Sequence, residues 1–307
     1  MTTAFITHHD CGLHNMGPEH PESPIRLLAI QKVLQKTGLI EHLKQMESVH
    51  VTPEQIQLAH ANLHQKRLEM KVPEEGVFYA DEDTALCPDS LHAASLAAGS
   101  TILATNQVLA EKVDNAFCAV RPPGHHAEHN AAMGFCFFNN VAIGAMHALL
   151  QPNVNRVAIV DFDVHHCNGT VDIFKDKPEV LVCSTFQHPY YPERYCDIQR
   201  DNIINCPIEA HTRASVFREQ LEKHWLPALQ KHKPDIIFIS AGFDAHHEDP
   251  MADLNLTEED YRWATQLLTD AARTTCGGRI VSVLEGGYNP VSLAFSVQAH
   301  LEVLAGY

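Results

Sequence analysis

The chain has 307 residues, of which 45% are hydrophobic and 20% charged, and its formal net charge is −16. This composition provides a large apolar core and the length suits one α/β domain, so we expect a single domain over residues 1–307. An acidic surface repels phosphates, which argues against direct DNA or RNA binding. The absence of a long apolar run and of a signal peptide predicts a cytoplasmic protein with no membrane partner.

Two helices can be delimited from their capping residues. Ser23 is expected to cap a helix with Pro24 in its first position, and Gly38 is expected to end it. Thr257 is followed by Glu-Glu-Asp, and acidic residues favour the positive end of a helix dipole, so a helix is predicted from there to about Thr275.

Short apolar runs between the helical patterns predict buried strands. They lack polar alternation, as expected for a parallel sheet covered on both faces. The runs are 116–120, 156–161, 180–186, 235–241 and 279–284. Their alternation with helices predicts an α/β fold: one open, doubly wound parallel sheet flanked by helices.

Cysteine and histidine usage carries two further hints. The nine cysteines are an odd number without a CxxC pair, and Cys118 and Cys183 lie in apolar runs. This pattern favours reduced core cysteines over a disulfide framework. The 22 histidines are clustered, which suggests metal chemistry.

Unusual polar motifs follow four of the predicted strands. RPPGHH follows 116–120, DFDVHH ends 156–161, AGFDAHH ends 235–241 and EGGY ends 279–284. Ligands of open α/β sheets bind beyond the carboxyl ends of the strands. The four motifs therefore predict one site at that edge of the sheet.

Asp161, Asp163 and His165 alternate along an extended segment, which places their side chains on one face. Carboxylate and imidazole suit zinc or iron, and a catalytic zinc has three protein ligands and one open position. Asp163 and His165 supply two ligands, and Asp244 is the best third. Asp161 would then orient a histidine from outside the ligand set. A DxDxHH string alone could be a solvated turn, but its combination with Asp244 and the paired histidines argues against that interpretation.

His125 and His126 follow the rigid Pro-Pro-Gly turn, and both can face one cleft. A hydrolytic reaction needs a base near the working pH, which an imidazole provides. Asp161 and Asn168 are candidate partners for the two rings, and an anionic partner makes its histidine more basic than a neutral one does. The alternative is a structural pair packed beneath a loop.

Tyr288 leaves a strand through two glycines, which permit a tight turn that could direct it into the site. A phenol donates a hydrogen bond without carrying charge, as a partner for a carbonyl oxygen should. Most tyrosines in such positions are simply half-buried aromatics.

The sequences RPPGHHA, GFCFFNNVA, DFDVHHCNGT, SAGFDAH and EGGY together resemble the zinc-dependent histone deacetylase family, which includes bacterial deacetylases and acetylpolyamine amidohydrolases. The resemblance runs from about His8 to the end. HPESPIR at 20–26, and Asn168 where class I members usually have Asp, are similar to the class II branch. The resemblance implies the arginase/deacetylase α/β fold.

The same resemblance implies roles for particular residues. Zinc, with Fe²⁺ as an alternative, would be bound by Asp163, His165 and Asp244. His126 would be the general base beside His125, and Tyr288 would polarise the acetyl carbonyl.

For the substrate, the resemblance implies that the Gly134 carbonyl accepts the amide N–H and that Phe135 and Tyr191 form the walls of a lysine tunnel. An acidic rim residue would be Asp81 or Asp83.

The resemblance also implies a structural monovalent-cation site, normally potassium, at Asp161, Asp163, His165, Ser184 and Thr185.

Four further residues bear on the resemblance, and two of them, Cys167 and Tyr191, are departures from the family pattern. Cys167 stands where HHGNG normally has glycine, Tyr191 replaces a phenylalanine, and Arg26 matches an arginine near an internal channel. Met251 occupies a position beside the tunnel mouth where polyamine-selective relatives carry an acid. It therefore favours acyl-lysine over polyamine substrates.

The sequence therefore predicts a zinc-dependent amidohydrolase that removes acetyl groups from lysine in proteins or peptides, histones among them. Three alternatives share some of these features. An acetylpolyamine amidohydrolase would share the site, and an acyl-lysine binder with low turnover usually lacks the tyrosine that Tyr288 provides. An arginase-like enzyme with two manganese ions would need bridging carboxylates that His165-His166-Cys167 does not supply.

Overall fold

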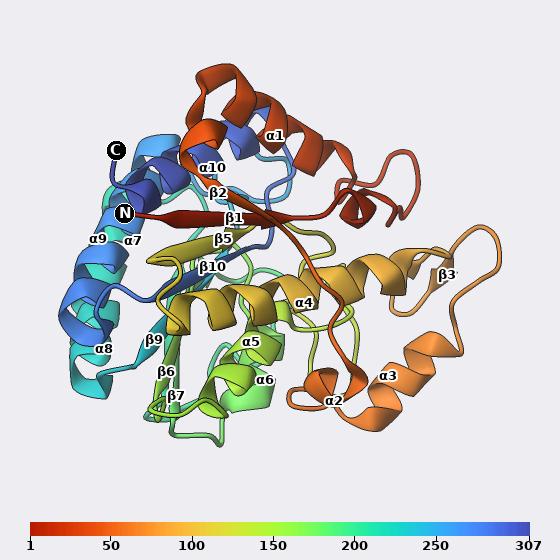
Figure 1. Ribbon diagram of the computed structural model, residues 1–307, viewed down its shortest axis with the longest axis horizontal. Helices are drawn as coiled ribbons and strands as arrows, with labels where there is room; N and C mark the ends of the chain where they lie inside the picture. The colour runs from red at the N-terminus through yellow and green to blue at the C-terminus, as the bar shows by residue number, and fades with distance from the viewer.

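An eight-stranded sheet runs through the middle of the computed structural model, which describes residues 1–307 (Figure 1). The strand order is β2-β1-β5-β10-β9-β6-β7-β8, and every neighbouring pair is parallel. The strands are β1 (Thr3–Thr7), β2 (Lys44–Glu47), β5 (Asn115–Cys118), β6 (Val157–Asp161), β7 (Val180–Gln187), β8 (Ile203–Ile208), β9 (Ile236–Ala241) and β10 (Ile280–Leu284). The predicted parallel α/β fold is confirmed.

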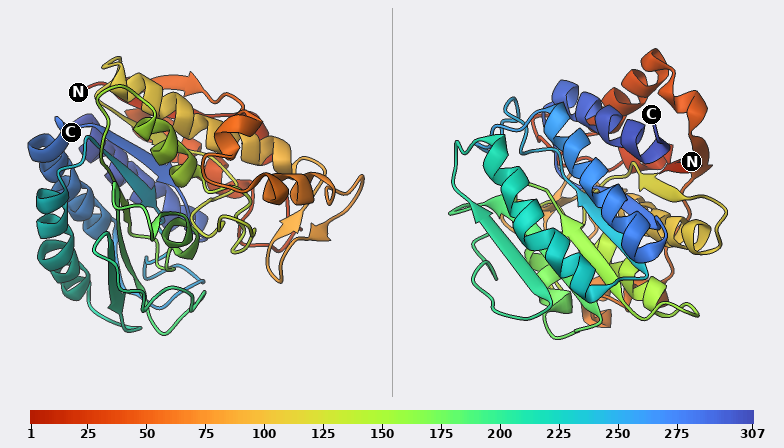
Figure 2. Two further views of the ribbon diagram at one scale, coloured as in Figure 1. Left: turned by 90° about the horizontal axis from the view of Figure 1, so that it is seen from below. Right: turned by 90° about the vertical axis from the view of Figure 1, so that its left-hand side faces the viewer.

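Helices cover both faces of this sheet (Figures 1 and 2). One face carries α4 (Ser90–Leu109), α5 (Asn140–Leu149) and α6 (Asn168–Phe174). The other carries α1 (Ile25–Thr37), α7 (Ala214–Gln220), α8 (Leu226–His232), α9 (Glu258–Cys276) and α10 (Pro290–Ala305), with one wider helical turn at Leu221–Trp225 between α7 and α8. None of the helices combines the length and apolar character needed to cross a bilayer.

Smaller elements extend beyond the carboxyl ends of the strands (Figure 1). They are α2 (Pro53–Ile56), α3 (Asn62–Glu69) and a short antiparallel hairpin of β3 (Phe78–Tyr79) and β4 (Ala85–Leu86). The loop between β3 and β4 includes Asp81 and Asp83 and therefore brings acidic residues toward the predicted site.

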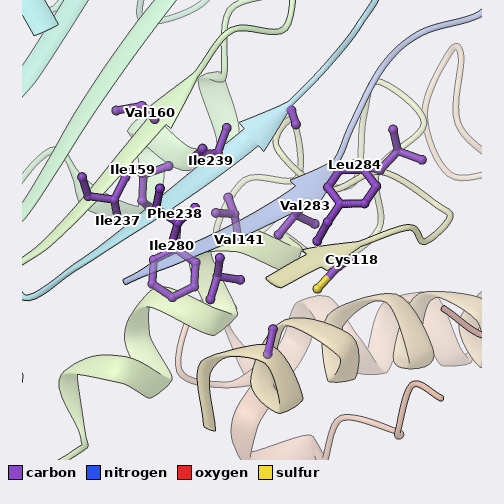
Figure 3. Packing of buried hydrophobic residues seen from close by; sticks show 14 of the residues in the cluster. Cys118, Val141, Ile159, Val160, Ile237, Phe238, Ile239, Ile280, Val283 and Leu284 are labelled. Carbon is purple, nitrogen blue, oxygen red and sulfur yellow. The ribbon is translucent and has the colours of Figure 1, made fainter. Parts of the chain in front are cut away.

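The central strands are buried on both faces, which explains their unbroken apolar sequences. Ile159, Phe238 and Val283, on three neighbouring strands, have no exposed surface (Figure 3). Cys118 lies in the same core, and all nine cysteines are free thiols, as predicted. Each large aliphatic or aromatic side chain buried here contributes about 1.5–3 kcal/mol to stability.

Three strands of the sheet, β1, β2 and β8, were not among the predicted runs, and one helix cap was misplaced. β2 is polar and exposed, and β8 contains Pro207, so neither has the apolar pattern of a central strand. Pro24, rather than Ser23, occupies the cap position of α1; the Ser23 carbonyl accepts the Arg26 N–H instead. Gly38 ends α1 with a φ of 77°, as predicted.

Candidate functional site

The four polar motifs follow four neighbouring strands in the centre of the sheet, β5, β10, β9 and β6. Because these strands are parallel, their carboxyl ends meet at one edge. The structure therefore brings together the metal-ligand candidates, the tandem histidines and the tyrosine that the sequence analysis placed there.

Asp163, His165 and Asp244 converge at a buried point with ligand atoms within 4.8 Å of one another. His165 Nδ1 lies 3.1 Å from Asp163 Oδ1 and 3.1 Å from Asp244 Oδ2. The two carboxylates have no exposed surface. Buried charges are costly unless they are paired, and a divalent cation would pair both at once. The donor set therefore fits a metal ion.

The backbone around this group leaves room only for glycine. A Cβ at Gly242 would stand 2.0 Å from Asp163 Oδ2, and a Cβ at Gly286 would stand 2.0 Å from Asp244 Oδ2. The Gly286 N–H donates to Asp163 Oδ2 at 2.8 Å. The glycines of AGFD and EGGY thus let two strands approach the carboxylates closely and hold them in place.

The proton affinity of His165 is high. Burial alone lowers the pKa of His165, but hydrogen bonds with Asp163 and Asp244 raise it to about 10. A cation bound by all three residues would replace that proton, because a metal ligand must be deprotonated.

The tandem histidines lie side by side, with ring centroids 4.0 Å apart, and each has its own partner. His125 Nδ1 is 2.9 Å from Asp161 Oδ2, and His126 Nδ1 is 2.7 Å from Asn168 Oδ1. These are the partners considered from the sequence. His126 lines the pocket described below, whereas His125 lies behind it.

The surroundings of the two rings separate their proton affinities. Burial alone lowers the pKa of His125, but Asp163 and Asp161 hold it well above its usual value. Burial and the neighbouring His125 and His165 hold the pKa of His126 well below its usual value. The site therefore pairs a charged imidazolium with a neutral imidazole, an arrangement that can both stabilise an anion and accept a proton.

Glu285 anchors the histidine turn, a role that the sequence analysis did not assign. Its Oε2 accepts the N–H groups of Gly124 at 2.6 Å and His125 at 3.0 Å. An acid directly after an apolar strand and before two glycines was the available signal. The contact ties the motif after β10 to the motif after β5.

A narrow pocket of about 210 Å³ opens from the metal-ligand group to the surface. It is lined by Asp83, His126, Gly134, Phe135, His165, Tyr190, Tyr191, Met251 and Tyr288. Pockets for drug-sized ligands measure about 300–1,000 Å³, so this smaller volume suits one extended side chain. Asp83, and not Asp81, is the acidic lining residue, and its Oδ1 accepts the Gly134 N–H at 3.0 Å.

Aromatic rings form the pocket walls. Tyr191 meets His126 edge-on at 5.2 Å, and Phe135 meets Tyr288 edge-on at 5.9 Å between centroids. Tyr190, which the sequence analysis missed, stacks on His165 at 5.7 Å, and its hydroxyl donates to the Met251 carbonyl at 2.7 Å. The resemblance pointed only to Tyr191, and a second tyrosine beside it in the chain is a weak signal.

Tyr288 is held from two sides. Arg26 lies 5.0 Å over its ring and donates to the Gly287 carbonyl at 2.6 Å, and the Tyr288 N–H donates to Asp249 Oδ2 at 2.7 Å. Burial raises the pKa of Tyr288 well above its usual value, so the phenol keeps its proton. It is therefore a fixed, neutral hydrogen-bond donor at the pocket.

Comparison with known proteins places the chain in a family. Residues 20–304 match the histone deacetylase domain. The chain belongs to the histone deacetylase family. It is 33% identical to the histone deacetylase-like amidohydrolase of Pseudomonas aeruginosa, over 99% of this chain and 86% of that protein. Family membership supports a hydrolase that acts on amides.

Two further matches bear on fold and substrate. The crystal structure of the HDA15 HD domain superposes with a TM-score of 0.93 at 32% identity, covering 99% of this chain and 88% of that one. The polyamine deacetylase HDAC10 of Mus musculus is 34% identical over all of this chain and 48% of that protein. The fold is thus that of a histone deacetylase domain, and the relatives include a polyamine deacetylase.

Cys167 departs from the glycine usual in this family without strain. It has a φ of −78° and is fully buried directly before α6. A negative φ is open to any residue, so glycine is not required there.

The buried hydroxyls of Ser184 and Ser240 have no hydrogen-bond partners, and neither does that of Thr185, the next residue of β7. Asp161 is in register with Ser184 on β7 and with Ser240 on β9. Unpaired buried oxygens next to a carboxylate fit a cation.

Proposed function

We propose that this histone deacetylase family member is a zinc-dependent lysine deacetylase that hydrolyses the acetyl amide of ε-acetyl-lysine in proteins or peptides. One observation carries the proposal. A single narrow pocket joins a buried Asp-His-Asp group, a neutral His126 and a neutral Tyr288.

The residues that would hold zinc are Asp163, His165 and Asp244, and Fe²⁺ suits the same ligands. When bound, the metal would supply a Lewis acid for the carbonyl and lower the pKa of water. We further propose that Asp161, Ser184 and Thr185 hold a potassium ion that stiffens the ends of β6 and β7.

The pocket residues orient the substrate. The aliphatic stem of acetyl-lysine would pass between Phe135 and Tyr191, whose rings exclude water. The Gly134 carbonyl would accept the amide N–H, since it accepts one hydrogen bond, from the Cys136 thiol at 3.2 Å, and has a second lone pair free. The Tyr288 hydroxyl would donate to the acetyl oxygen, which gains negative charge in the transition state.

His126 would transfer the protons, and His125 would stabilise the developing charge. His126 Nε2 would accept a proton from water as the water oxygen bonds to the carbonyl carbon. The imidazolium of His125, paired with Asp161, would stabilise the tetrahedral oxyanion. As the C–N bond breaks, His126 would return the proton to the leaving ε-amine, and the products are acetate and lysine.

Acetate release tests this proposal. Purified protein supplied with zinc should release acetate from an acetyl-lysine peptide, and a chelator should abolish the release. Tyr288→Phe serves as the matched control, because it removes one hydroxyl. Binding of the peptide without acetate release by the wild-type protein would instead indicate an acyl-lysine binder.

Acetylpolyamine hydrolysis is the second candidate, because one relative is named a polyamine deacetylase. The uncharged Met251 at the pocket favours a peptide, since a carboxylate there would attract a remote ammonium. Comparison of kcat/KM for N-acetylputrescine and an acetyl-lysine peptide separates the two.

A further inference from the structure

The proposed base His126 works only in one tautomer. Its Nδ1 faces Asn168 Oδ1 at 2.7 Å. An amide oxygen accepts, so Nδ1 carries the proton and Nε2 keeps the lone pair that a base requires. If the amide of Asn168 were reversed, its NH₂ group would face Nδ1 and the proton would move to Nε2. The orientation of Asn168 therefore decides whether His126 can act as a base.

Glu128 determines that orientation. Asn168 Nδ2 donates to Glu128 Oε1 at 2.8 Å. An ionised carboxylate only accepts hydrogen bonds, so it binds the NH₂ group and rejects the oxygen of the amide. The other contacts of Nδ2, the His126 carbonyl at 3.4 Å and Met133 Sδ at 3.2 Å, are acceptors as well.

Arg194 in turn holds Glu128. The Glu128 side chain is only 7% exposed, and Arg194 Nη2 lies 3.0 Å from Glu128 Oε2, opposite the oxygen that meets Asn168. Burial raises the pKa of Glu128, while Asn168 and Arg194 oppose that rise. Asp172, paired with Lys175, is the remaining charged neighbour. The result is a continuous polar chain from a surface arginine to the pocket.

We propose that Glu128 is a positioning residue: it orients Asn168 so that His126 carries its proton on Nδ1 and presents a free Nε2 to the pocket. This inference rests on the proposed role of His126 as the base. It also gives a physical reason for Asn at position 168. An aspartate there would place two carboxylates in hydrogen-bond contact, which forces one of them to retain a proton.

The first test compares two substitutions at one position. Glu128→Gln keeps an acceptor oxygen for Asn168, whereas Glu128→Leu removes it with little change in volume. General-base catalysis contributes about 10²–10⁴ in rate, and partial loss of the correct tautomer should cost about 10–100-fold in kcat. We expect that loss in Glu128→Leu with KM within about twofold of wild type, and retention of at least about a third of kcat in Glu128→Gln. Equal losses in both variants, or kcat unchanged in Glu128→Leu, would overturn the proposal.

The second test reads the tautomer directly and does not depend on activity. In zinc-loaded protein with ¹⁵N-labelled histidine, the signals of His126 can be identified by their absence in His126→Gln. Wild type and Glu128→Gln should show protonated Nδ1 and bare Nε2, and Glu128→Leu should shift toward the other tautomer. If the wild-type protein releases no acetate and Glu128→Leu still shows the tautomer shift, the proposed function is wrong and the positioning role stands. If the wild-type protein is active and Glu128→Leu leaves the His126 signals unchanged, only the positioning role is wrong.

The third test exchanges the two partners. Asn168→Asp alone should lose activity increasingly as pH rises, because the proton shared with Glu128 is lost. Adding Glu128→Gln supplies an amide N–H that can donate to the new carboxylate, so the double variant should recover at least about tenfold in kcat/KM at pH 8 over Asn168→Asp. Simple additivity of the two substitutions would contradict a shared role. Thermal unfolding of each variant verifies that the fold is intact.

Discussion

The metal-ligand group and the pocket wall are built in different ways. Asp163 and Asp244 follow adjacent, parallel, fully buried strands and lie close to the backbone of Gly242 and Gly286. Phe135, Tyr191 and Met251 lie on connecting segments and are only partly buried. The chemistry thus depends on the rigid centre of the sheet, while the loops set what can reach it. Substitutions at the ligand group should abolish activity, and substitutions in the wall should tune it.

The largest effect is expected at the ligand group. Asp244→Ala or Asp163→Ala should abolish both zinc binding and deacetylation, because two remaining ligands hold the metal weakly. The fold should survive, since the lost group is itself a buried charge. Zinc content by metal analysis and a circular dichroism spectrum provide the measurements. Full zinc occupancy in Asp244→Ala would identify another acid as the third ligand.

Tyr288→Phe should produce the next largest effect, because the tyrosine joins both regions. Loss of one oxyanion donor typically costs about 10²–10³ in kcat. A hydroxamate, which chelates zinc, should still bind with nearly unchanged affinity, as measured by calorimetry. Activity within a few fold of wild type would show that Tyr288 does not polarise the carbonyl.

A smaller effect is expected from the wall at Met251. Met251→Glu should shift the ratio of kcat/KM for N-acetylputrescine over an acetyl-lysine peptide toward the polyamine. A charged hydrogen bond in a partly dry cleft is worth about 1–3 kcal/mol, which corresponds to about 5–150-fold in the ratio. Met251→Gln is the matched control without charge. A wild-type enzyme that already prefers the polyamine would refute the peptide preference.

The smallest effect is expected behind the ligand group at Cys167. Because its φ is negative, Cys167→Gly relieves no strain and should leave kcat/KM within about twofold, while the added chain entropy lowers unfolding stability by at least about 0.5–1 kcal/mol. Urea unfolding measures the change in stability, and steady-state kinetics measure kcat/KM. An increase in stability would show that the cysteine is strained.

Much of the fold and the candidate site could be predicted from the sequence. A strand buried on both faces must be apolar throughout, so the central strands stood out, and the polar residues that interrupt those runs marked the sheet edge. The alternation of an extended segment predicted that Asp163 and His165 share a face. They do converge, although β6 ends at Asp161 and residues 163–165 form a bend rather than part of the strand. Those inferences depend on local periodicity, which can be recognised in a short segment without knowledge of the rest of the chain.

Only the tertiary structure decided which distant residues meet. Glu128, Asp249 and Glu285 are acids in loops or at strand ends, and nothing near them in the chain shows that they orient Asn168, Tyr288 and the histidine turn. The choice of Asp83 over Asp81 required the position of the β3–β4 loop over the pocket. These contacts join residues far apart in the chain, and a hydrogen bond between such residues depends on where the whole sheet places them rather than on sequence spacing.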